Sequence, residues 1–187
     1  MTPEQFLQEL NRNERQLRHA LERTIPLKVS VEMEEFAKEN FRQGGFVDNG
    51  LTPWKRTLRQ SFGKGEDASR TPLLSRNRNL MNSVQHRYSP FKATVYNDLE
   101  YADIHNEGGP IQVTERMKRF FWAKHIESKD QMGRESPEAE FWKRMALKKP
   151  GCTIRIPERH FLGPGPEVDN IVTGIIEKEL DEFIKTH

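Results

Sequence analysis

Cysteine is almost missing from this sequence of 187 residues, since Cys152 is the only one. A single thiol excludes an internal disulfide and a zinc site built from several cysteines, and it fits a protein of a reducing compartment. Long apolar runs are missing too, because none approaches the roughly 20 residues of a membrane span. We therefore expect no internal disulfide, and we do not expect a membrane as a partner.

Hydrophobic residues are scarce as well. They make up 34% of the chain, and charged residues make up 31%. In typical globular domains apolar usage is nearer ~45–50%, on a slightly different residue set. So small a supply of core residues suits an elongated protein, or one that completes its burial against partners.

Motifs that carry chemistry are also missing. His105 and Glu107 are two residues apart, which places them on different faces of a helix. His86, His125 and His160 lack the spacing of zinc ligands, and no nucleophile lies in a recognisable turn beside His105. The sequence therefore predicts no metal, no cofactor and no enzyme. A small hydrolase or metalloenzyme around His105 and His160 remains the weakest alternative.

The charge is spread unevenly. Residues 48–97 carry nine basic and three acidic groups (net +6), whereas residues 166–187 carry two basic and six acidic groups (net −4). Arg70, Arg76 and Arg78 of the basic part are candidates to contact phosphates or an acidic protein surface. Few aromatic residues are interleaved with them, so a DNA contact would not be sequence-specific. Opposite charges at separate places also suit head-to-tail contact between copies.

Periodicity and composition divide the chain into three parts. Residues 1–43 are predicted as an N-terminal helical segment, because two amphipathic stripes follow one another there. Residues 44–72 are rich in glycine, proline and basic residues, so we expect an irregular, mobile loop. Residues 73–187 are predicted as an α+β core with a helical insertion over about 114–149.

Within the core, the expected strands and helices alternate irregularly. Ser89-Pro90 predicts a turn between two strands, and Thr114 and Ser136-Pro137 each predict the start of a helix. The expected helices lie at 73–84, 115–128, from 137 onward and over the last amphipathic stretch, and the expected strands lie at 84–89, 92–97, 111–113 and 152–156.

The stretch 101–110 is the most distinctive part of the chain. Asp98 is a good N-cap for a short helix. The corner Gly108-Gly109 suits the left-handed position that ends it, and Pro110 prevents the helix from resuming. Three side chains would share one face of that helix, and we expect them to pack against the sheet: Tyr101, Ile104 and His105.

A second unusual stretch, 156–163, joins a strand to the last helix. Its prolines and glycines fix its path, and an arginine close to an aromatic residue is typical of interface anchors. One interpretation therefore exposes Arg159, Phe161 and Leu162 at a subunit contact. The other buries Phe161 and Leu162 beneath the last helix, with Arg159 as the cap of that helix.

The motifs occur in a fixed order along the chain. They are Pro53-Trp54 with Leu58, then Leu74, Leu80 and Ser83-Val84, then Tyr101 to Gly109, then Met117 to Phe121, and last Ile156 to Gly163. This ordered set resembles the phage virion morphogenesis family, the tail-completion proteins of Mu-like phages and prophages. The resemblance covers about residues 50–185.

The resemblance implies a fold and a role. The implied fold is α+β, a small, mostly antiparallel sheet packed by helices, similar to tail-terminator and neck proteins, with extra N-terminal helices. The implied role is structural: ring-type self-assembly completes the tail or neck and lets the head join, first in the cytoplasm of the bacterial host and then in the virion.

The same resemblance implies partners and residues. The partners are further copies of the chain and the phage tail-tube and head-neck proteins. A nucleic-acid-binding module that uses the basic segment remains the alternative. The interface or motif residues are Tyr101, Ile104, His105, Gly108, Gly109, Arg159, Phe161, Leu162 and Gly163.

Overall fold

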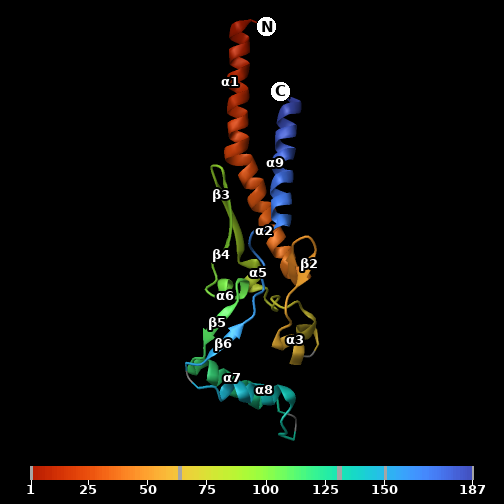
Figure 1. The fold of residues 1–187 in the computed structure, drawn as a ribbon, viewed down its shortest axis with the longest axis vertical. Coiled ribbons are helices and arrows are strands. Elements are labelled where there is room, and N and C mark those ends of the chain that lie inside the picture. Colours follow the sequence, from red (N-terminus) through yellow and green to blue (C-terminus); the bar gives the residue numbers. More distant parts are fainter. Residues whose placement is uncertain (1, 63–64, 130–131, 150, 187) are drawn as a thin grey trace.

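The computed structural model describes residues 2–62, 65–129, 132–149 and 151–186, and the molecule is elongated (Figure 1). At one end, α1 (Pro3–His19), the π-helical turn η1 (Ala20–Thr24) and α2 (Ile25–Gln43) follow one another without a break. α9 (Pro166–Thr186) lies beside them and runs in the opposite direction, so both termini point toward the same end (Figure 1).

Local chemistry sets both ends of the long helix. The Thr2 hydroxyl accepts the N–H of Gln5, whose side chain accepts the N–H of Thr2 in return, and this exchange satisfies two free donors. Gly44 ends α2 at a φ of 76°, a left-handed conformation that costs glycine little. The predicted end at Gly44 is therefore confirmed. The two predicted helices are one, because the backbone stays helical from His19 to Ile25.

β3 (Val84–Ser89) and β4 (Lys92–Asn97) form an antiparallel hairpin that packs against α2. Both ranges match the prediction. The register pairs the ends of the strands, Val84 with Asn97 and Ser89 with Lys92. The ring of His86 also contacts the carboxylate of Glu34 on α2, which ties the hairpin to that helix.

The main core lies where α2 meets the hairpin and the stretch 156–163. Phe41 of α2 is at its centre, with its ring centroid 4.8 Å from that of Phe161 and 5.7 Å from that of Trp54. Each large apolar side chain buried in this way contributes about 1.5–3 kcal/mol. The other buried members are Ala37, Leu73, Leu80, Met81, Val84 and Ala102.

The segment 44–72 contains more regular structure than its composition predicts. Its elements are the antiparallel pair β1 (Gly45–Val47) and β2 (Leu51–Pro53), followed by α3 (Leu58–Phe62) and α4 (Glu66–Ser69). Trp54 anchors it in the core, and the Thr71 hydroxyl donates to the carbonyl oxygen of Phe41 at 2.6 Å. The mobility of this segment stays a prediction.

At the end of the molecule away from the termini, a two-stranded ribbon carries a helical hairpin (Figure 1). β5 (Gly109–Gln112) pairs with β6 (Thr153–Ile156), and α7 (Glu115–Glu127) and α8 (Pro137–Ala146) lie between them in the sequence. Thr114 and Ser136 cap the two helices by accepting backbone N–H groups, as predicted. A second, smaller core joins helices and ribbon through Val113, Phe121 and Ala146.

The structure is α+β with N-terminal helices, as predicted. Its β structure, over the ranges described, is three separate antiparallel pairs rather than one sheet. In those ranges no helix combines the length and the apolar run that crossing a bilayer requires.

Two local predictions are wrong. The helix expected over 73–84 is reduced to α5 (Asn79–Asn82), because Arg78 has a φ of 54° that breaks the helix and Leu73 turns into the core instead. Asp98 does not cap the next helix, α6 (Ala102–Asn106). Tyr101 occupies the cap position and makes no side-chain cap hydrogen bond there.

Candidate functional site

The two distinctive stretches, 101–110 and 156–163, lie against each other. The N–H of Arg159 donates to the carbonyl oxygen of His105 at 2.9 Å. One residue later on α6, the Asn106 side chain accepts the N–H groups of Phe161 and Leu162, at 2.9 Å and 3.1 Å. A hydrogen-bonded junction therefore joins α6 to the segment 156–163 that leads into α9.

Gly108 makes the close approach between the two stretches. Its φ of 70° confirms the predicted left-handed position after α6. A Cβ placed there would lie 2.5 Å from the backbone nitrogen of Glu158 and 2.9 Å from its Cα. Backbone cannot move aside as the end of a flexible side chain can, so this position excludes any side chain. Gly109, the second residue of the corner, begins β5.

Arg159 and Phe161 are interior residues of the chain. Arg159 is 6% exposed, and its Nε donates to the carbonyl oxygen of Lys55 at 3.0 Å. Burial lowers the pKa of its guanidinium from the ordinary value. Phe161 is 2% exposed and packs on Phe41. The expectation that this segment exposes an arginine and an aromatic residue together is therefore wrong, and Arg159 does not cap α9.

Leu162 and Gly163 continue the junction toward α9. Leu162 is half-buried and lines an apolar groove between α2, β4 and α9, together with Gly163 and Val172. A Cβ at Gly163 would meet the ring of His160 at 2.1 Å. That ring also packs edge-on against Phe46, with the centroids 4.6 Å apart. These residues seat the start of α9 on the core.

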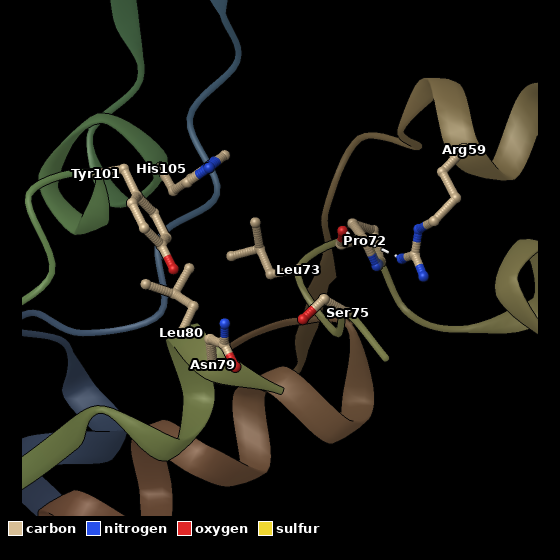
Figure 2. A pocket seen from close by; sticks show the side chains of 8 residues that line it. All are labelled: Arg59, Pro72, Leu73, Ser75, Asn79, Leu80, Tyr101 and His105. Atoms are coloured by element: carbon tan, nitrogen blue, oxygen red, sulfur yellow. Dashed lines mark hydrogen bonds between the residues drawn. The ribbon is translucent and has the colours of Figure 1, made fainter. Parts of the chain in front are cut away.

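Tyr101 and His105 border a pocket of about 350 Å³ (Figure 2). Their rings are perpendicular, with centroids 6.0 Å apart, and the Tyr101 ring points toward Leu80 (Figure 2). Tyr101 is 42% exposed. The expected packing against a sheet is therefore wrong for these two residues, which face the segment 72–80. Ile104 instead turns toward the corner, 3.2 Å from where a Cβ of Gly109 would be.

His105 is the titratable group of this pocket that the structure perturbs. Burial lowers its pKa below 6.5, and the positive charge of Arg159 lowers it further. Its buried Nδ1 makes no hydrogen bond to any residue that the structure describes. The residues that line the pocket are Arg59, Pro72, Leu73, Ser75, Asn79, Leu80, Tyr101 and His105.

The pocket brings an imidazole and a hydroxyl to one lining, those of His105 and Ser75. Its lining residues include no carboxylate to orient the imidazole ring. His160 does not line it. No group of three potential metal ligands occurs within the described ranges.

The three arginines proposed as anion contacts differ in their surroundings. Arg70 pairs with Glu66, with Nη2 2.7 Å from the carboxylate oxygen. Arg76 and Arg78 are exposed in the turn before α5. Arg59, from the same basic segment, donates to the carbonyl oxygens of Thr71 and Leu74. Part of the positive charge of this segment thus holds the fold together.

Two asparagines that make up the junction were missed from the sequence. Asn106 supplies the hydrogen bonds already described. Asn40 is fully buried on α2; it donates to Phe161 O at 3.4 Å and accepts the N–H of Val47 at 3.1 Å. One signal was available, because Asn40 lies three residues after Ala37 on the apolar face of its helix, where a polar side chain needs partners.

A family model described as the phage virion morphogenesis family matches residues 3–181. Comparison with curated proteins and with solved structures finds no match. The matched range includes both stretches of the junction, the long N-terminal helix and nearly all of α9.

Proposed function

The chain belongs to the phage virion morphogenesis family, and we propose that it assembles into a ring that completes the tail or neck of the phage and enables the head to join. The match over residues 3–181 carries this proposal, because it places the chain among structural assembly proteins along nearly its whole length. We propose three things beyond the family: ring assembly, a role in joining head and tail, and tail-tube and head-neck proteins as partners.

The surface of the molecule supports a role in assembly. Large apolar side chains are exposed near the termini and again on the distant helical hairpin. They include Phe6, Leu7 and Leu10 on α1, Phe120 and Ile126 on α7, and Leu147 after α8. Exposed apolar groups of this size are typical of surfaces that contact other proteins. An elongated subunit with such groups toward both ends can contact more than one neighbour.

The junction gives those surfaces a fixed relation. Asn106, Gly108 and Arg159 connect the ribbon that carries α7 and α8 to the core beneath α2 and α9. A subunit that binds neighbours through surfaces at both ends must hold those surfaces at one angle, since the orientation of neighbours decides whether an assembly closes. We assign the junction this positioning role.

The alternative, a nucleic-acid-binding module, draws support from Arg76 and Arg78. Both are exposed, and neither forms an ion pair in the part of the chain that the structure describes. Arg59 and Arg70 bond within the protein, which leaves less of the basic segment for phosphates.

Native mass spectrometry of the purified chain, alone and with the tail-tube protein of the same phage, tests the proposal. We expect one closed oligomer, or its formation on adding the tail-tube protein. A monomer under both conditions would overturn ring assembly. Binding to duplex DNA that weakens steeply with salt, from a chain that stays monomeric, would favour the alternative.

A further inference from the structure

We propose that copies of this chain contact one another through a basic stripe on α1 and an acidic stripe on α9, with the α1 of one copy docked on the α9 of the next. This inference rests on the proposed self-assembly and names its contact. The basic stripe is Arg12 and Arg15 on α1 with Arg23 on the adjoining η1, and the acidic stripe is Asp169, Glu177 and Asp181 on α9.

The two helices are short of partners within their own chain. α1 has 17 residues and α9 has 21, and neither contains a buried residue among those described. A helix in water is marginal at this length and draws most of its stability from packing an apolar face. Phe6 and Leu10 remain about half exposed on α1. Both helices therefore have surface that a neighbour would cover.

The basic stripe runs along the exposed surface of the long helix. Arg12 and Arg15 are one turn apart on α1, and Arg23 follows in η1, which continues the same helix. All three are exposed. None forms an ion pair in the described part of the chain, whereas the neighbouring Arg18 pairs with Glu14 and Glu22. Arg12 and Arg15 also border a shallow groove along the helix that includes Ala20 and Thr24.

The acidic stripe has matching properties. Asp169, Glu177 and Asp181 all lie on the solvent-exposed side of α9, where Glu177 and Asp181 are one turn apart. They are exposed and take part in no ion pair between described residues, while Glu179, on the side toward α2, pairs with Lys28. Thr173 and Gly174 lie between them, and a Cβ at Gly174 would meet nothing within 4 Å.

The stripes agree in length and differ in sign. At a rise of 1.5 Å per residue, the basic stripe spans roughly 16 Å and the acidic stripe roughly 18 Å. Opposed charges of this kind favour correct docking and disfavour like-charged partners. Because one stripe belongs to α1 and the other to α9, a docked pair of copies still presents one free stripe of each kind. Such a contact propagates head to tail and closes into a ring where the rotation permits.

Charge reversal tests this contact. One variant carries Arg12→Glu, Arg15→Glu and Arg23→Glu, and a second carries Asp169→Lys, Glu177→Lys and Asp181→Lys. Because the positions are exposed, circular dichroism should show each variant folded. We expect either variant alone to raise the dissociation constant of self-association by roughly tenfold or more. A matched control, Lys92→Glu with Arg155→Glu at exposed positions of β4 and β6, should assemble like the wild type.

Mixing the two variants tests the contact more specifically than either variant alone. Each stripe of one variant is complementary to a stripe of the other, so an equimolar mixture should assemble although neither does alone. If the wild type assembles and the variants assemble equally well, this contact is wrong while the proposed ring stands. If the α1 variant loses binding to the tail-tube protein or to DNA but still self-associates, the occupant of the basic stripe is not a second copy. A wild type that never assembles overturns both the contact and the proposed function.

Discussion

The side-chain amide of Asn106 bonds both backbone polar groups of Leu162, its N–H and its carbonyl oxygen. Nδ2 donates to the Leu162 carbonyl oxygen at 2.9 Å, and Oδ1 accepts the Leu162 N–H at 3.1 Å. The same oxygen accepts the N–H of Phe161. Asn106 and Leu162 are 56 positions apart in the sequence. One side chain therefore fixes the path along which the chain leaves the ribbon and enters α9.

Replacing Asn106 by alanine should destabilise the protein strongly. The change leaves two N–H groups and one carbonyl oxygen without their partner, and an unsatisfied buried group costs about 1–3 kcal/mol. We expect the free energy of unfolding in urea to fall by about 3 kcal/mol. Asn77→Ala, at an exposed position in the turn before α5, is the control and should change it little. Equal stability of the two variants would contradict the role of Asn106.

Gly108→Ala should cost more than Gly151→Ala. Both glycines have a positive φ, of 70° and 82°, so both variants pay about 1–2 kcal/mol for the left-handed backbone. Only at Gly108 would the new Cβ meet backbone atoms, since nothing lies within 4 Å at Gly151. The steric conflict should add about 1–3 kcal/mol. Thermal unfolding of the pair checks this, and similar melting temperatures would argue against the close approach to Glu158.

Arg159→Ala should act through stability. The variant removes the donor to the Lys55 carbonyl oxygen and leaves a space beside the core, so we expect a loss of about 2 kcal/mol. Arg155→Ala, exposed on β6, is the matched control. A variant that is fully stable but fails to join heads to tails would restore the interface interpretation. A variant that is fully stable and also joins heads to tails would contradict both the core interpretation and the interface interpretation of Arg159.

His105 should make the protein less stable in mild acid. Its folded-state pKa lies below 6.5, because burial and the charge of Arg159 disfavour the imidazolium. The unfolded chain therefore binds the proton more readily than the folded chain. The contribution of neutral His105 to the free energy of unfolding is fully present above the ordinary pKa of histidine, and it is lost as the pH falls from that pKa through the lower folded-state pKa. Unfolding free energies at about pH 7.5 and pH 5.5 should differ less in His105→Gln than in the wild type. An unchanged difference would contradict this.

Signals confined to a few neighbouring residues predicted their structure well. Thr114 and Ser136 cap their helices, Gly108 takes the left-handed position, and the hairpin turns beyond Ser89. In each case the residue itself supplies the bond or the backbone freedom that the element requires. The start and end of an element depend on such groups, so a reading of single residues is enough.

Contacts between distant residues were not predictable in this way. The apolar residues at 73–84 suited a helix, but the core draws in Leu73 and Leu80 from either side of a turn at Arg78. Arg159 looked exposed because its acceptor, the Lys55 carbonyl, lies 104 positions away. Every residue has a backbone carbonyl, so the residue type does not show which carbonyl accepts a distant donor. Neither this bond nor the bonds of Asn106 to the backbone could therefore be predicted from residue types.

Electron microscopy of particles from a phage that lacks this protein tests the central claim most directly. The account predicts filled heads and tails of normal length that remain separate, and joined virions once the wild-type chain is supplied in the same cells. Variants of the α1 and α9 stripes should fail to restore joining alone and should restore it when expressed together. Normal, joined and infectious virions without the protein would contradict its role in head–tail joining.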